Sequence, residues 1–167
     1  SLLYHGWDES KKQKWCDSLT GKSPEVWSRS MGWYVMALSD IIEMLPKDLA
    51  KRKTLIQILN RTIAALVKYQ DPSSGVWYQI VNKGGMKGNY LEASGSTMFT
   101  YAMAKGINKG YLPASFKPAL QKAFTGLKKE FITVDEKGLP HIHHSCSGAG
   151  LGGTPYRSGT YEYYVND

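Results

Sequence analysis

The 167-residue sequence has little cysteine and no long hydrophobic run, and each shortage excludes a class of protein. Its only two cysteines, Cys16 and Cys146, have no metal-ligand spacing, so they are predicted to be free buried thiols, with one disulfide as the alternative. No stretch of about 18 apolar residues occurs, so no membrane span is expected. The hydrophobic share of 42% excludes a disordered chain.

Acidic residues are also scarce relative to basic ones. The 21 Lys and Arg against 14 Asp and Glu give a formal net charge of +7, which favours an anionic partner such as nucleic acid, an acidic polysaccharide or an anionic surface. The lysines are scattered without a basic stripe among stacking aromatics, so nucleic acid is not predicted and most lysines are expected to be solvated. The 11 Tyr and 5 Trp lie largely in loop-like stretches, which is typical of a carbohydrate-binding surface, although core packing is the simpler explanation.

Three of the four histidines are close together near the end of the chain: His141, His143 and His144. They have no carboxylate or cysteine partner at ligand spacing. We therefore predict neither a metal site nor a cofactor.

Hydrophobic patterns predict four helices, near residues 24–45, 48–70, 94–109 and 116–131. The first and third are apolar on most sides, which indicates inner helices with protein packed on every face. The second and fourth have a one-sided apolar stripe, which indicates outer helices. The stripe of the fourth consists of Leu120, Ala123, Phe124, Leu127 and Phe131.

The chain repeats one order of segments: a short extended piece, a loop, an inner helix and an outer helix. Tyr4, Tyr78 and His141 occupy similar places in three successive copies. Stacked helical hairpins of this kind predict an all-α fold, either a double-layered α/α toroid or an open solenoid. Because two whole hairpins cannot close a toroid, we expect residues 1–167 to be a single domain that is part of a longer protein. Its exposed inner faces would then contact the missing N-terminal half or a second copy of the chain.

The stretch 26–38 opens the first inner helix and carries the main candidate binding residues. A guanidinium on a buried helix, here that of Arg29, needs an anionic partner. That partner is either the planar carboxylate of a ligand or a nearby Asp or Glu, and both remain open. Trp27 and Trp33 offer flat faces on which sugar rings can lie. Loops that precede inner helices gather on one face, which is expected to carry His5, Trp7, Trp27, Arg29, Trp33, Trp77 and the glycine-rich 145–155 loop.

Four segments have a pattern that is typical of one enzyme family. They are Tyr4-His5-Gly6-Trp7-Asp8-Glu9, Trp27-Ser28-Arg29-Ser30-Met31-Gly32-Trp33-Tyr34, Cys146-Ser147-Gly148-Ala149-Gly150 and Tyr156-Arg157-Ser158-Gly159-Thr160-Tyr161-Glu162-Tyr163-Tyr164. They span nearly the whole chain and resemble glycoside hydrolase family 105, the unsaturated rhamnogalacturonyl hydrolases. The resemblance implies an (α/α)6 barrel, of which this chain is roughly the C-terminal half, without the final helix.

The resemblance also implies a substrate and a mechanism. The substrate is Δ4,5-unsaturated galacturonic acid linked to rhamnose, an acidic oligosaccharide left by pectin lyases. Such enzymes do not use the usual pair of carboxylates. One Asp hydrates the C4=C5 double bond, and the hemiketal that results rearranges and expels the neighbouring sugar. That Asp lies outside this sequence, so the fragment alone is expected to be inactive, and Asp8 is expected to be structural, orienting Arg29 or a loop.

Site residues follow from the same resemblance. His5 would hydrogen-bond around the reacting ring, Arg29 would contact the acidic sugar, and Trp33 would stack on it, with Trp27 close by. The segment from Gly148 to Gly150 would offer backbone amides to the uronate carboxylate, since glycine lets the backbone approach a ligand. The family commonly has Gly-Asn where this chain has Ser30-Met31, a departure that bears on substrate choice.

Two other functions remain open from the sequence. One is an α/α toroid that binds acidic glycans without turnover, and the other is an epimerase or lyase on the same scaffold. The compartment is not determined, and both the cytoplasm and the periplasm of a bacterium are compatible with the sequence.

Overall fold

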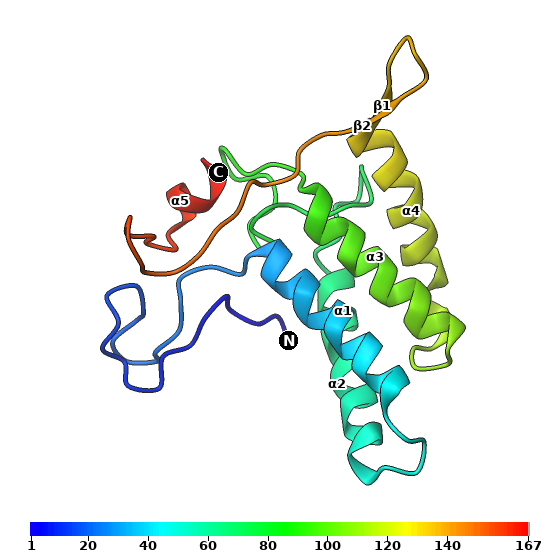
Figure 1. The fold of residues 1–167 in the computed structure, drawn as a ribbon, viewed down its shortest axis with the longest axis horizontal. Coiled ribbons are helices and arrows are strands. Elements are labelled where there is room, and N and C mark those ends of the chain that lie inside the picture. Colours follow the sequence, from blue (N-terminus) through cyan, green and yellow to red (C-terminus); the bar gives the residue numbers. More distant parts are fainter. Residues whose placement is uncertain (167) are drawn as a thin grey trace.

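The computed structural model describes residues 1–166 as two helical hairpins with a lobe of loops beside them (Figure 1). A two-stranded antiparallel ribbon and a short last helix complete the fold. The elements are α1 (Ser28–Met44), α2 (Ala50–Val67), α3 (Ala93–Asn108), a 3-10 turn (Ala114–Phe116), α4 (Lys117–Phe131), β1 (Ile132–Val134), β2 (Pro140–Ile142) and α5 (Tyr161–Val165).

All four predicted helices are confirmed, and the largest difference lies at the start of the first. α1 begins at Ser28 and not near residue 24, because the preceding residues are extended and pair with another extended segment. The amide of Val81 donates to the carbonyl of Val26 at 3.1 Å, and Trp27 forms a bridge with Ile80. Backbone groups engaged in this pairing cannot join the helix.

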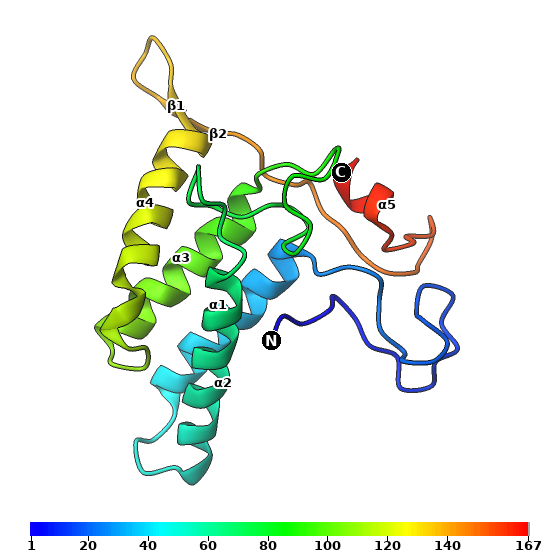
Figure 2. The same cartoon turned by 180° about the vertical axis from the view of Figure 1, so that it is seen from behind.

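The inner layer consists of α1 and α3, which make the most extensive helix–helix contact. Glycines allow the close approach: a Cβ on Gly95 would lie 2.8 Å from the carbonyl carbon of Ser28, and one on Gly32 would lie 2.9 Å from the Cβ of Met98. In the two opposite views, α2 lies against α1 and α4 lies against α3 (Figures 1 and 2). This close crossing brings the N-terminal turns of both inner helices side by side.

The core lies between the inner and outer helices. Leu59, Ile63 and Leu66 of α2 are buried, which confirms its predicted stripe. Trp77, from the extended segment before α3, is fully buried, and its indole N–H donates to the carbonyl of Leu66 at 2.8 Å. Its ring meets Phe99 of α3 edge-on at 5.2 Å. The extended segment thus fills the space between an outer helix and the next inner helix.

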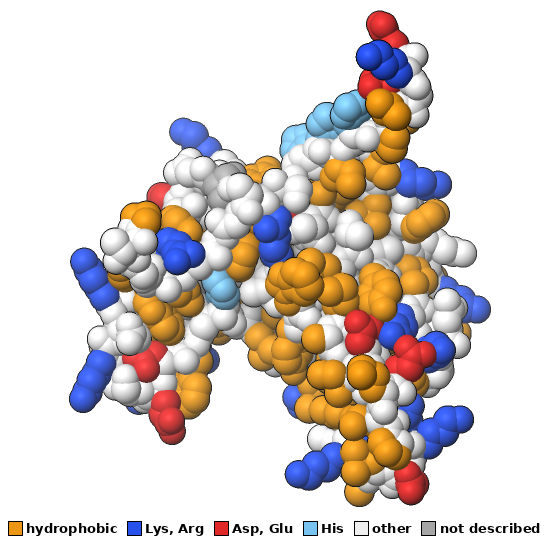
Figure 3. Space-filling model, in the orientation of Figure 1, with side chains coloured by type: hydrophobic (Ala, Val, Ile, Leu, Met, Phe, Trp, Pro, Cys, Tyr) orange, Lys and Arg blue, Asp and Glu red, His pale blue; other side chains and the backbone are white. Residues whose placement is uncertain are grey.

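The prediction that protein packs on every face of the first inner helix is wrong for the described residues. Trp33 is 55% exposed, Ile41 is 48% exposed and Met44 is 83% exposed. Figure 3 shows hydrophobic side chains gathered over α1 on the face toward the viewer. The reason is that α2 and α3 cover only part of the circumference of α1, and no other helix within residues 1–166 covers the rest. We name the exposed side formed by Trp33, Ile41 and Met44 the open face of α1.

The predicted stripe of α4 is correct except at one position. Ala123 and Phe131 are buried, whereas Phe124 is 57% exposed and has the ammonium of Lys128 4.8 Å from its ring centroid. Phe131 lies seven residues later on nearly the same side of the helix and is buried because Val76 and Ala93 pack against it, whereas Phe124 is not part of a buried cluster within residues 1–166.

The sequence analysis did not predict the antiparallel ribbon of β1 and β2. Residues Ile132 and Val134 pair with Ile142 and Pro140, respectively, so these apolar side chains share one face. Both strands are exposed along their whole length. The helix predictions rested on patterns of buried apolar residues. Neither strand has a buried residue, so this signal could not reveal the ribbon.

Within residues 1–166, no helix combines the length and the apolar character needed to cross a membrane. Over the same residues, no three His, Cys, Asp or Glu side chains gather as a metal site would require. Neither cysteine forms a disulfide within residues 1–166; Cys146 is buried as predicted, but Cys16 is partly exposed.

The α1–α3 crossing gives a stability prediction. Substitution Gly95→Ala should lower the free energy of unfolding by about 1–3 kcal/mol through overpacking against Ser28. This loss should appear in spite of the roughly 1 kcal/mol by which alanine favours a helix over glycine. Denaturant unfolding measures it, with Gly148→Ala as the control because a Cβ there would meet nothing within 4 Å. Equal stabilities for the two variants would contradict the close crossing.

Candidate functional site

The N-terminal segment and α5 lie side by side and form the lobe next to the inner helices (Figures 1 and 2). A Cβ on Gly6 would lie 2.6 Å from the side chain of Leu151, which shows how closely the two ends of the chain approach. This contact brings residues from both ends of the sequence to the N-terminal end of α1.

Three rings form the centre of the lobe. The centroids of His5 and Trp27 are 4.7 Å apart, and Trp27 stacks on Tyr164 at 5.7 Å with an interplanar angle of 29°. The hydroxyl of Tyr164 lies 2.5 Å from Nδ1 of His5. We name these three residues the ring cluster. Buried Gln79 fixes two of them, since its amide oxygen accepts from the Trp27 indole N–H at 3.1 Å and its amide nitrogen donates to the Tyr164 carbonyl at 3.2 Å.

Burial sets the protonation of the ring cluster. It lowers the pKa of His5, because a charged imidazolium loses its hydration. Burial also raises the pKa of Tyr164, and the nearby charges of Tyr163 and Glu25 add to that rise. At neutral pH the pair is therefore a neutral imidazole facing a protonated phenol.

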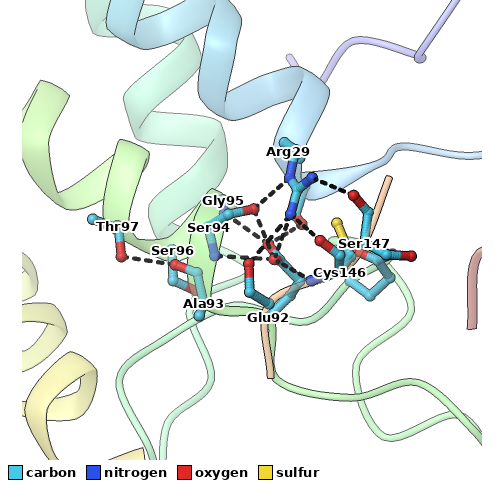
Figure 4. Close-up of polar contacts among 12 residues, drawn as sticks. Arg29, Glu92, Ala93, Ser94, Gly95, Ser96, Thr97, Cys146 and Ser147 are labelled. Atoms are coloured by element: carbon cyan, nitrogen blue, oxygen red, sulfur yellow. Dashed lines mark hydrogen bonds and ion pairs between the residues drawn. The ribbon is translucent and has the colours of Figure 1, made fainter. Parts of the chain in front are cut away.

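Arg29 lies in the first turn of α1 and joins α3 to the segment 145–147 (Figure 4). Its Nε donates to the hydroxyl of Ser94 at 2.7 Å, and its Nη2 donates to the carbonyl of Cys146 and to the hydroxyl of Ser145, the latter at 3.3 Å. Its Nη1 reaches the carbonyl of Ser147 at 3.5 Å, the longest of these contacts. The guanidinium is thus mostly engaged by the protein, with 17% of the side chain exposed.

Glu92 is the anionic partner of Arg29, with Oε1 3.8 Å from Nη2 and no exposed side-chain surface. It caps α3, where the positive end of the helix dipole favours a carboxylate. Its oxygens accept hydrogen bonds from the amides of Ser94, Gly95 and Cys146 and from the hydroxyls of Ser28 and Ser94. The protein partner that the sequence left open for Arg29 is therefore present.

The remaining predicted site residues occupy different surroundings. Trp33 lies one helical turn beyond Arg29 on the same side of α1, with its ring largely exposed. A Cβ on Gly148 would meet nothing within 4 Å, whereas one on Gly150 would lie 2.7 Å from the guanidinium of Arg157. The structure thus brings His5, Trp27, Arg29 and the segment 146–148 together. Trp33 lies at the open face of α1, and Gly150 packs against Arg157.

Asp8 organises its own loop, as predicted, but it does not orient Arg29. Its carboxylate accepts from the amides of Ser10, Lys12 and Gln13 at 2.8–3.1 Å. The amide of Gln13, followed by the hydroxyl of Ser10, contributes most to lowering the pKa of Asp8 to about 2.

Sequence reasoning missed three residues of the site: Gln79, Glu92 and Tyr164. Glu92 could have been suspected because it directly precedes a helix that begins with small and hydroxyl residues, although glutamate is not a usual capping residue. Tyr164 belongs to the segment 156–164 that carried the family resemblance, but its tyrosines had no assigned role. For Gln79, a buried amide in an extended segment, the sequence has no signal.

Comparison with known proteins decides the family. The sequence pattern of Glycosyl Hydrolase Family 88 matches residues 1–167. The chain belongs to this family. The resemblance to glycoside hydrolase family 105 is confirmed as well, since one matching solved structure is named as a member of family 105 and two others as possible members.

Three similar proteins show how far the likeness extends. A solved glycoside hydrolase of family 105 from C. acetobutylicum is 52% identical with a TM-score of 0.96, over 98% of this chain and 46% of that one. A 24.9 kDa protein in the picA locus of Rhizobium radiobacter is 37% identical over 172 residues, which cover 99% of this chain and 73% of that protein. An unsaturated 3S-rhamnoglycuronyl hydrolase from Formosa agariphila is 30% identical over 102 residues, which cover 60% of this chain and 26% of that protein.

The fold prediction is confirmed by these comparisons. The helical hairpins of this chain have the α/α-toroid fold of its family 88 and 105 neighbours, which are built of six such hairpins. The chain spans about half the length of the solved C. acetobutylicum relative, of which it covers 46%.

The contacts of Arg29 generate a prediction about the segment 145–150. Substitution Arg29→Ala removes the donors that hold Ser145, Cys146 and Ser147, so backbone hydrogen exchange in this segment should become at least about tenfold faster. The free energy of unfolding should fall by about 1–3 kcal/mol, because buried Glu92 keeps its other hydrogen bonds. Arg29→Lys should restore little of the protection, since one ammonium cannot span partners on both sides.

The control for this experiment is Arg61→Ala, which removes an exposed arginine from α2. If hydrogen exchange in 145–150 is as slow in the Arg29→Ala protein as in the wild type, Arg29 does not hold this segment.

Proposed function

We propose that this chain supplies the substrate-binding face of an unsaturated glycuronyl hydrolase that acts on Δ4,5-unsaturated galacturonyl-rhamnose oligosaccharides. The observation that carries the proposal is membership of the glycoside hydrolase family, with 52% identity to a family 105 enzyme over 98% of the chain. The similar protein from Formosa agariphila, named as an unsaturated 3S-rhamnoglycuronyl hydrolase, supports an unsaturated uronide as the substrate class. The formal net charge of +7 suits an acidic oligosaccharide.

In the proposed mechanism an Asp outside this sequence protonates the C4=C5 double bond and directs water to it. The hemiketal that forms then rearranges and expels the neighbouring sugar. This chain would bind and orient the unsaturated ring, with His5 as a hydrogen-bonding group, Trp33 as a stacking surface and Trp27 beneath His5. Backbone amides in the segment 148–150 would meet the uronate carboxylate.

We propose that Arg29 contacts the substrate through one nitrogen and not through its whole guanidinium fork. Since Nε and Nη2 are engaged, a uronate carboxylate would be met by Nη1, whose bond to Ser147 is long at 3.5 Å. In this role Arg29 both holds the segment that presents backbone amides and adds a positive charge behind it.

A specific observation keeps a binding function as the second candidate. Two carboxylates near the ring cluster, Glu25 and Glu92, are buried in ion pairs with Lys83 and Arg29. A carboxylate held in this way is a poor general acid, because its proton has no path to a ligand. Residues 1–166 would therefore bind an acidic glycan but not hydrolyse it, unless an Asp from elsewhere completes the site.

The exposed ring of Trp33 offers a test of the substrate. In a protein that includes residues 1–167 and the Asp-bearing hairpins, Trp33→Ala should lower kcat/KM for the unsaturated disaccharide by about tenfold, or roughly 1.4 kcal/mol, through lost stacking. The melting temperature should barely change, because the ring is 55% exposed. Turnover is measured as loss of the ultraviolet absorbance of the double bond.

The matched control is Phe124→Ala, which removes another exposed aromatic ring from the outer helix α4. Binding of the disaccharide by calorimetry with no loss of absorbance would replace hydrolysis by the binding function. A Trp33→Ala protein with full turnover would remove Trp33 from the site.

We further propose that the part of the open face of α1 formed by Ile41 and Met44 is covered by other hairpins of the same toroid, which leaves the Trp33 ring accessible. In a closed toroid each inner helix has an inner helix on both sides, whereas α1 has only α3 beside it within the described residues. The side chains of Ile41 and Met44 would be buried by the missing neighbour.

The open face predicts the solution behaviour of residues 1–167 on their own. The chain should self-associate at micromolar concentration, and the double substitution Ile41→Lys with Met44→Lys should shift it toward the monomer in light scattering. Leu19→Lys is the control, because Leu19 is 80% exposed but lies in the lobe away from α1. A wild-type chain that stays monomeric would show that this face needs no partner.

A further inference from the structure

The hydroxyl of Tyr164 is buried with a single acceptor in reach among the described residues, and that acceptor is Nδ1 of His5 at 2.5 Å. We infer that Tyr164 is a positioning residue: its hydroxyl donates to Nδ1 of His5, so the neutral imidazole carries its proton on Nε2 and presents that N–H to the substrate. The part about the substrate rests on the proposed function, whereas the tautomer does not.

The direction of this hydrogen bond follows from the need of each buried group for a partner. A neutral imidazole has one donor and one acceptor nitrogen. If Nδ1 were the donor, the proton of the Tyr164 hydroxyl would need another acceptor, and no other is recorded for it within residues 1–166. A buried hydroxyl without an acceptor is strongly disfavoured, so the arrangement with Tyr164 as donor is preferred.

The surroundings keep both partners uncharged. The charge of the Glu25 carboxylate helps to raise the pKa of Tyr164, and its Oε1 is held by Lys83 at 2.5 Å. The backbone carbonyl of Glu25 accepts from the His5 amide at 3.2 Å. Trp27 covers one face of the imidazole, and Tyr163 packs edge-on against Tyr164. Burial is the cause that lowers the pKa of His5 and disfavours an imidazolium.

A fixed tautomer restricts what His5 can do. Its Nδ1 is occupied, so His5 cannot pass a proton through the ring from one partner to another while this bond persists. The only polar atom left for a ligand is Nε2, as a donor. The Nε2–H group can donate to an acceptor oxygen of the sugar, such as a ring, hydroxyl or glycosidic oxygen. It cannot act as a base that removes a proton from the sugar.

The tautomer can be measured in the chain without any substrate. Nitrogen NMR of the protein labelled with 15N-histidine should show His5 with a protonated Nε2 and an unprotonated Nδ1, with its signals assigned by their loss in His5→Gln. In Tyr164→Phe the hydroxyl is lost, and His5 should change to a mixture of tautomers. Tyr163→Phe is the matched control, because it makes the same chemical change in the adjacent ring and should leave the His5 signals as they are.

Two outcomes would overturn the inference: a protonated Nδ1 in the wild-type protein, or an unchanged tautomer in a folded Tyr164→Phe protein. If Tyr164→Phe does not fold, the wild-type spectrum alone decides, since it reports the protonated nitrogen directly.

A second readout applies to a protein that turns over unsaturated uronides. Loss of the Tyr164 hydroxyl removes a donor that favours the neutral imidazole, so the acid limb of the pH profile of kcat/KM should move to higher pH in Tyr164→Phe. The value at the optimum should fall about tenfold. A purely structural role would lower kcat/KM without moving the limb, and that result would overturn the positioning role. Absence of turnover in every variant, together with the expected NMR result, would contradict the proposed function and leave the tautomer assignment standing.

Discussion

The site depends on one buried ion pair, that of Arg29 with Glu92, at the junction of the two inner helices. Glu92 is stable there because five hydrogen bonds and the N-terminus of α3 surround it, and Arg29 supplies the compensating charge. The same guanidinium holds the carbonyl of Cys146, so the segment after the ribbon is attached to both helices. Without this junction, the lobe that carries the ring cluster would have far fewer links to the hairpins.

Much of the helical architecture could be predicted from the sequence, because apolar periodicity reports which side of a helix is buried. The ends were predictable where one residue decides them: Pro46 follows the end of α1, and Gly110, with φ of 73°, follows α3. The start of α1 was not predictable, since it depends on pairing with residues 80 and 81, more than 50 positions away. Phe124 and Phe131 lie on nearly the same side of α4, and only Phe131 is covered by Val76 and Ala93, which the periodicity of α4 alone does not show.

The candidate site, like the fold, could be predicted from the sequence only in part. The family resemblance singled out His5, Trp27 and Arg29, and the structure brings them together at the N-terminal end of α1. What the residues do there depends on contacts between distant positions, such as the 159 residues that separate His5 from Tyr164. A local pattern can mark a residue as part of a motif, but it cannot show that a guanidinium is already engaged by its own protein.

The facing glycines of the inner helices have a consequence for how this fold tolerates sequence change. A Cβ added to Gly32 would lie 3.4 Å from the Cα of Gly95, so the two positions share one small volume. Whichever of them first gains a side chain forces the helices apart, and the second change then meets a crossing that is already widened. The effects of the two substitutions should therefore be less than additive, and the pair should vary as a unit among sequences that keep the same junction.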